Sequence, residues 1–127
     1  MTKIILTLCT LSALLLALDW EKDMDTALAV AQKEHKNVMV MVEGEHCRWC
    51  KKMKARTLLD EGVEKRLSKY VVVKVMREDG NAMAKLPPVE GVPTIFFMKE
   101  NKAIIEEIMG YYNVEDFISR IDALEKK

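Results

Sequence analysis

The sequence predicts an α/β sandwich in which helices flank a central mixed four-stranded sheet. Two observations predict this fold class. The short apolar runs at residues 37–44 and 70–76 are separated by a helical pattern, and strands that are joined through helices usually pair in parallel. The runs at 93–99 and 103–110 are separated only by the turn ENK, so we expect them to form an antiparallel hairpin.

The domain opens with a predicted helix at residues 19–36. Apolar residues recur at helical spacing from Met24 to Ala31, which indicates one buried face. Either Asp23 or Asp25 can cap the first turn of this helix.

The next predicted element is a strand at residues 37–44, which ends at Gly44. It is apolar on both faces, and this is typical of a central strand that is covered on both sides. A helical pattern then restarts over 47–60. We expect Gly62 to interrupt it and a second short helix to follow over 63–69.

A loop and a last helix complete the order of elements. Residues 77–91 predict a loop with one helical turn near 82–86. Asn113 with Asp116 three residues later resembles a capping box, so we expect the final helix over 114–127.

The first 18 residues precede this domain, which we place at residues 19–127. A short basic start, MTK, is followed by the apolar run IILTLCTLSALLLAL, and this arrangement is typical of a secretory signal. The run is shorter than the roughly 20 apolar residues of a spanning helix. We therefore predict a signal peptide at 1–18, with an uncleaved anchor as the alternative, and a bacterial periplasmic location.

Composition and cysteine content restrict the function further. The 20 basic and 20 acidic residues give a formal net charge of zero, so nothing favours nucleic acid as a partner, and a monomer is the default. Cys9 lies in the apolar leader, which leaves Cys47 and Cys50. In an oxidising compartment free thiols do not persist without a reason.

Cys47 and Cys50 stand in the stretch EGEHCRWCKKMK, where the predicted strand gives way to the helix. Zinc requires four ligands, and the chain offers one cysteine pair with no second paired motif, so we expect no metal site. A disulfide across two residues constrains the unfolded chain very little, so a purely structural role is also weak. The remaining interpretation is a dithiol that cycles. The helix N-terminus and the basic run favour a Cys47 thiolate, which attacks a substrate disulfide before Cys50 resolves the mixed disulfide.

The mature chain resembles the thioredoxin superfamily in CRWCK after a buried strand, in VVVKVM, in GVPTIFFMKENK and in GYYNVEDFISRI. Within this superfamily it looks like the exported thioredoxin-related oxidoreductases, and it is also similar to the thioredoxin-like domain of the membrane electron conductor for disulfide reduction. The resemblance implies a thioredoxin fold with Cys47 as the exposed nucleophile and Cys50 as the buried resolving thiol. It implies a cis Val92–Pro93 bond opposite the cysteines, where the Val92 backbone pairs with an extended substrate and Pro93 keeps metals off the dithiol.

Some positions depart from the pattern of thioredoxins proper, which carry a buried aspartate, a tryptophan and a proline where this chain has Met41, His46 and Ala55. Without the aspartate, the sequence does not identify the group that takes the proton from Cys50. Glu43 and Glu45 are the nearest carboxylates in the sequence, with Lys74 on the neighbouring strand. We expect both glutamates to be solvent-exposed, because carboxylates are seldom buried without partners.

Arg48 and Trp49 stand between the cysteines, where the resemblance implies an influence on the redox potential. Arg48 stabilises the thiolate and favours a more oxidising potential. Trp49 is interpreted either as a flat contact for substrate or as packing.

The predicted function is a thiol–disulfide oxidoreductase that reduces protein disulfides or mixed disulfides. Its redox group is the Cys47–Cys50 disulfide, with no bound cofactor, and an electron donor in the membrane is the expected second partner. The alternative is a binding module that uses the Val92–Pro93 groove, with the cysteines as a passive switch or as copper ligands.

Overall fold

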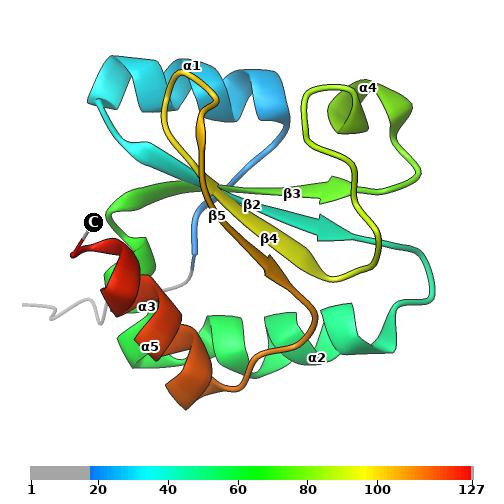
Figure 1. Ribbon diagram of the computed structural model, residues 1–127, viewed down its shortest axis with the longest axis vertical. Helices are drawn as coiled ribbons and strands as arrows, with labels where there is room; N and C mark the ends of the chain where they lie inside the picture. Colours follow the sequence, from blue (N-terminus) through cyan, green and yellow to red (C-terminus); the bar gives the residue numbers. More distant parts are fainter. Residues whose placement is uncertain (1–17, 127) are drawn as a thin grey trace, which may run out of the picture.

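The computed structural model describes residues 18–126 and shows one twisted sheet between two layers of helices (Figure 1). The expected fold class is therefore confirmed. Of the predicted leader at residues 1–18, only Leu18 lies within the described part of the chain. Between residues 18 and 126, no helix is both long enough and apolar enough to cross a membrane.

The sheet has five strands in the order β1-β3-β2-β4-β5, where four strands were expected. Central β2 runs parallel to β3 and antiparallel to β4, and β4 and β5 form the predicted antiparallel hairpin. The strands are β1 (Trp20–Glu21), β2 (Asn37–Glu43), β3 (Tyr70–Met76), β4 (Thr94–Met98) and β5 (Ile104–Met109).

The additional strand corrects the predicted start of the first helix. Trp20 and Glu21 pair in parallel with β3, and α1 (Met24–Glu34) begins only after them. Asp23 sets that boundary, because its side chain accepts a hydrogen bond from the Thr26 amide at 2.8 Å as an N-cap. A strand of two residues is too short to show an apolar periodicity in the sequence. It is defined by its pairing with β3.

The two faces of the sheet carry separate hydrophobic cores. Side chains alternate along a strand, so Met39 and Met41 of β2 face one core while Val40 faces the other. Helices α1 and α4 (Gly80–Met83) cover the Val40 face. The opposite face is covered by α2 (Arg48–Ala55), the 3₁₀ turn η1 (Thr57–Leu59), α3 (Glu61–Leu67) and α5 (Val114–Leu124).

The break between α2 and α3 falls earlier than the sequence suggested. Gly62, expected to interrupt the helices, lies inside α3. The chain turns instead through η1 to Asp60, which caps α3 by accepting a hydrogen bond from the Val63 amide at 3.1 Å. A Cβ atom at position 62 would lie 3.1 Å from Asp60 Oδ2, so the glycine leaves room for the cap.

The remaining expectations hold with small shifts of boundary. Asn113 caps α5 through the Asp116 amide at 2.9 Å. The single helical turn of the long loop is α4, capped by Asp79 and placed two residues earlier than predicted.

Candidate active site

Cys47 and Cys50 form a disulfide at the junction between β2 and α2. Their sulfur atoms are 2.12 Å apart and their Cα atoms 5.3 Å apart. Cys47 is the N-cap residue of α2, and its Sγ accepts a hydrogen bond from the Cys50 amide at 3.1 Å. Cys50 is 1 % exposed, whereas Cys47 is only partly buried. The sulfur that the sequence assigned as nucleophile is thus the more accessible of the two.

The electrostatic surroundings of Cys47 favour negative charge. The amino end of α2 presents unpaired backbone N–H groups and the positive end of the helix dipole, and its first turn holds no acidic residue. When the disulfide is reduced, these groups stabilise a thiolate at Cys47 over a thiol. Arg48 adds a formal positive charge directly after Cys47.

The Val92–Pro93 peptide bond is cis, as the resemblance implied, and it leads directly into β4. Two hydrogen bonds hold this turn. The Thr94 hydroxyl donates to the Gly91 carbonyl at 2.6 Å, and the Gly110 amide donates to the Pro93 carbonyl at 2.8 Å. The turn is therefore fixed both to its own strand and to the end of β5.

A groove beside the disulfide brings several of the predicted residues together. Trp49, Val92 and Pro93 line it, and its volume is about 380 Å³. Arg48 lies over the indole of Trp49, with its guanidinium carbon 5.6 Å from the ring centroid. Trp49 is 45 % exposed, which favours the contact surface over core packing among its two interpretations.

Sequence reasoning missed Tyr111, which lines the same groove together with Gly110. The rings of Tyr111 and Trp49 have centroids 5.5 Å apart, and Lys52 Nζ lies 4.8 Å from each centroid. The available signal was the motif GYY directly after the last strand. Gly110 turns the chain there with a φ of 91°, a conformation that favours glycine.

One of the two glutamates near the site is buried, which corrects the expectation of exposure. Glu43 is 8 % exposed, and its Oε1 accepts a hydrogen bond from Lys54 Nζ at 2.5 Å. The alternation of β2 places Glu43 on the same side of the sheet as Met41, facing α2. Lys54 supplies the charge partner that a buried carboxylate needs. Glu45 is exposed, as predicted.

Met41, which stands where thioredoxins carry an aspartate, is fully buried. Lys74 is its partner across the β2–β3 ladder. Lys74 Nζ lies 4.8 Å from the centroid of Trp20, so a ring face shields this cation. Among residues 18–126 no group of three or more His, Cys, Asp or Glu side chains could hold a metal ion.

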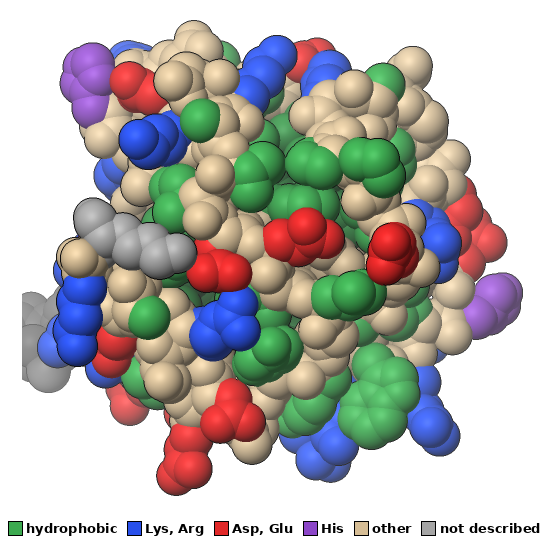
Figure 2. Space-filling view, viewed as in Figure 1, with side chains coloured by type: hydrophobic (Ala, Val, Ile, Leu, Met, Phe, Trp, Pro, Cys, Tyr) green, Lys and Arg blue, Asp and Glu red, His purple; other side chains and the backbone are tan. Residues whose placement is uncertain are grey.

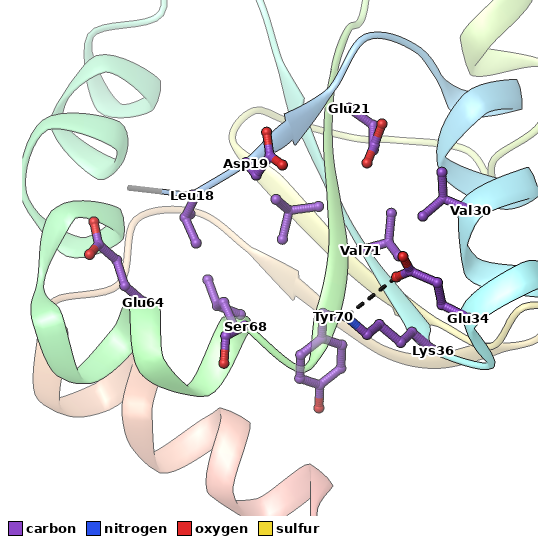
Figure 3. A pocket seen from close by; sticks show the side chains of 12 residues that line it. Leu18, Asp19, Glu21, Val30, Glu34, Lys36, Glu64, Ser68, Tyr70 and Val71 are labelled. Carbon is purple, nitrogen blue, oxygen red and sulfur yellow. Dashed lines mark ion pairs between the residues drawn. The ribbon is translucent and has the colours of Figure 1, made fainter. Parts of the chain in front are cut away.

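A different cavity, of about 310 Å³, lies at the opposite end of the sheet (Figure 3). The cavity is lined by Leu18, which is the first described residue, by the start of β3 at Tyr70 and by the end of α1. Glu34 and Lys36 form an ion pair at its rim, at 3.4 Å. Its lining includes no cysteine and no histidine.

A disulfide at the N-cap of the helix that follows the central strand, together with a cis-proline turn, defines the thiol–disulfide oxidoreductases of thioredoxin fold. The chain belongs to the thioredoxin-like domain family, whose profile matches residues 24–125.

Similar proteins agree with this assignment. The chain is 34 % identical over 101 residues to the thiol:disulfide interchange protein DsbD of Pectobacterium atrosepticum, which covers 75 % of this chain and 17 % of that protein. The chain thus spans about a sixth of its curated relative. A thioredoxin from Thermus thermophilus is 26 % identical, with a TM-score of 0.72 over 85 % of this chain and 87 % of that one. The oxidised C-terminal domain of Neisseria meningitidis DsbD, 24 % identical, shares the fold with a TM-score of 0.64, over 78 % and 90 % of the two chains.

Proposed function

We propose that this chain is an exported thiol–disulfide oxidoreductase that reduces protein disulfides or mixed disulfides in the periplasm. The observation that carries the proposal is the asymmetry of the disulfide: a partly exposed Cys47 at a helix N-terminus and a Cys50 that is 1 % exposed. The domain responsible is residues 19–127, preceded by a leader at 1–18. The family match over residues 24–125 supports this division.

The reaction starts from the reduced dithiol. The Cys47 thiolate attacks one sulfur of a substrate disulfide, a Cys47–substrate bond forms, and the other substrate sulfur leaves as a thiolate that takes up a proton. The Cys50 thiol then loses its proton and attacks Cys47 Sγ. The Cys47–Cys50 disulfide forms, the substrate sulfur leaves as a second thiol, and the two electrons have passed to the substrate.

The groove provides the place for the substrate chain. Val92 would offer its backbone to an extended segment, with Pro93 beneath it and Trp49 as a flat wall. Arg48 acts on the nucleophile, because a positive charge after Cys47 favours the thiolate. These roles require no cofactor besides the disulfide itself.

The relative in Pectobacterium atrosepticum is named as a thiol:disulfide interchange protein, which supports disulfide exchange at Cys47 and Cys50. The reducing direction, the periplasmic location and a membrane electron donor are further parts of this proposal. The test of direction is a redox titration of residues 19–127 against glutathione. We expect a midpoint nearer the roughly −270 mV of reducing thioredoxins than the roughly −120 mV of strong oxidants. A midpoint near the oxidising value would contradict the reductase proposal.

The test of mechanism is a pair of single substitutions. Cys50→Ser should accumulate mixed disulfides through Cys47, because the resolving thiol is gone. Cys47→Ser, the matched control, should trap nothing, because Cys50 is buried. Mass spectrometry of the trapped species would identify the substrates. A Cys50→Ser protein that retains partners without a covalent bond would favour the binding module instead.

A further inference from the structure

Three cations at the start of α2 have no acidic partner within residues 18–126. Arg48, Lys51 and Lys52 form no ion pair there. The first turn of α2 also holds no acidic residue that could pair with them. Other basic side chains are paired, in Lys54–Glu43, Arg66–Asp122, Lys85–Asp25 and Arg120–Glu106, and some elsewhere on the surface, such as Lys65, form no ion pair within the described residues. The surface next to Cys47 therefore carries positive charge that the described fold does not neutralise.

Two of these cations are held in place by aromatic rings. Lys52 Nζ lies 4.8 Å from the ring centroids of both Trp49 and Tyr111, and Arg48 Cζ lies 5.6 Å from the ring centroid of Trp49. Cation–π contacts restrict a flexible side chain without removing its charge. Trp49 and Tyr111 line the groove together with Val92 and Pro93, and Arg48 and Lys52 lie against these two rings; we call the four residues the cationic wall.

A second hollow, with two acidic side chains in its lining, lies next to the groove. Its volume is about 350 Å³, and it is lined by Pro88, Glu90, Glu107 and Met109. The hollows adjoin, because segment 88–93 and segment 107–111 line both, and a Cβ atom at Gly91 would lie 3.8 Å from Met109 Sδ. Glu90 and Glu107 are exposed and form no ion pair within residues 18–126.

The space-filling view shows this face of the molecule. Hydrophobic side chains gather over β4 and β5, blue basic side chains flank a large hydrophobic one near the start of α2, and red acidic side chains lie over β5 (Figure 2). The apolar floor and the two charged ends follow one line across the molecule. A bound chain along this line would meet positive charge at one end and negative charge at the other.

We propose that this two-ended groove selects extended protein segments that carry an acidic residue on one side of their disulfide cysteine and a basic residue on the other. The inference rests on the proposed function and adds the charges that the substrate carries on the two sides of its cysteine. The acidic residue lies against Arg48 and Lys52, and the basic residue lies against Glu90 and Glu107. The apolar floor binds the backbone between them, so charge decides which segments react fastest.

The experiment measures single-turnover reduction by the reduced protein. Five peptides each carry one cysteine as a mixed disulfide with 2-mercaptoethanol: neutral, acidic only, basic only, acidic before and basic after the cysteine, and the inverse order. The protein dithiol is oxidised to a disulfide as each peptide disulfide is reduced to two thiols. Acid-quenched samples separated by chromatography give the rates. Bis(2-hydroxyethyl) disulfide serves as an uncharged probe for normalising every rate.

We expect one of the two bipolar orders to react about 3- to 10-fold faster than the neutral peptide and faster than its inverse. The acidic-only peptide should outpace the basic-only peptide, and the preference should shrink as salt rises. Lys52→Glu should reverse the acidic preference, and Glu107→Lys should weaken the preference for the basic end. Lys65→Glu, the same charge change on exposed α3, should leave the order of the peptides unchanged.

Two failures are distinguishable. If the reduced wild-type protein does not react with bis(2-hydroxyethyl) disulfide, the proposed function itself is wrong. If that probe reacts but the five peptides differ by less than twofold, or Lys52→Glu and Lys65→Glu behave alike, charge selection is overturned while the oxidoreductase activity stands.

Discussion

Glu43 and Lys54 form an ion pair beneath the disulfide site, with Lys54 Nζ 2.5 Å from Glu43 Oε1. The side chains are 11 % and 32 % exposed, so the carboxylate is the more deeply buried partner. Lys54 lies one helical turn after Cys50 on α2, and Glu43 ends the strand that leads to Cys47. The pair therefore ties the helix that carries the resolving thiol to the central strand.

Lys54→Met should destabilise the oxidised protein by about 1–3 kcal/mol, because it leaves a buried carboxylate without its charge partner. Urea denaturation measures the free energy of unfolding. Lys51→Met is the matched control: it removes an exposed, unpaired lysine from the same helix and should change stability by less than about 0.5 kcal/mol. Equal effects of the two substitutions would show that the Glu43–Lys54 pair contributes nothing.

Thr57 links the turn after α2 to the loop that carries Tyr111. Its fully buried hydroxyl donates to the Tyr112 carbonyl at 2.6 Å. Thr57→Val keeps the shape but leaves that carbonyl unsatisfied, so we expect a loss of about 1–2 kcal/mol in unfolding free energy. Thr57→Ser retains the hydroxyl and should lose less. If serine proves as costly as or costlier than valine, the methyl group matters more than the hydrogen bond.

We expect the free energy of unfolding to fall at alkaline pH because of Tyr70. Burial, and then the nearby Glu125 that accepts a hydrogen bond from its hydroxyl at 3.1 Å, raise the pKa of Tyr70 to about 12. Because the unfolded pKa is about 10, the folded state holds this proton more tightly. The contribution is complete below pH 10 and is lost as the pH rises from about 10 towards 12.

Ultraviolet absorbance of phenolate measures this titration directly. Of the three tyrosines, one should ionise distinctly later than a model tyrosine, and Tyr70→Phe should remove that late step. The fall in unfolding free energy above pH 10 should also be smaller in Tyr70→Phe than in the wild type. A late phenolate that persists in the variant would assign the shift to another tyrosine.

In the reduced protein, Cys47 should be alkylated by iodoacetamide faster at neutral pH than an ordinary peptide thiol, whose pKa is about 8.5. The N-cap position and the absence of acidic residues from the first turn of α2 stabilise its thiolate. Cys50, which is 1 % exposed, should stay unmodified. A peptide of residues 43–54 is the control. An identical pH profile for protein and peptide would show that the helix does not activate Cys47.

Most elements were predictable because their signals are local. Strands β2 to β5 and the long helices follow from apolar periodicity, and Asp23 and Asn113 mark helix starts by their side-chain chemistry. Strand β1 was not predictable in this way, because two residues have no period and pairing with β3 alone defines them.

The candidate site was likewise predictable where its signals are local and not where they depend on the folded structure. Cys47 and Cys50 could be paired from their spacing, but bringing Val92 and Pro93 into the same site required the family resemblance. Glu43 was expected to be exposed because its burial depends on Lys54, a residue on the next element. Tyr111 was missed because its contact with Trp49 exists only once β5 has paired with β4.

The placement of β1 gives the domain a direction. Trp20 is level with Val72 of β3, and Val72 is level with Met39 near the start of β2, so the described chain enters at the end of the sheet away from Cys47. Figure 1 shows the blue start of the described chain lying away from the amino end of α2. A substrate that reaches Cys47 therefore meets the opposite end of the sheet from the one at which the described chain begins.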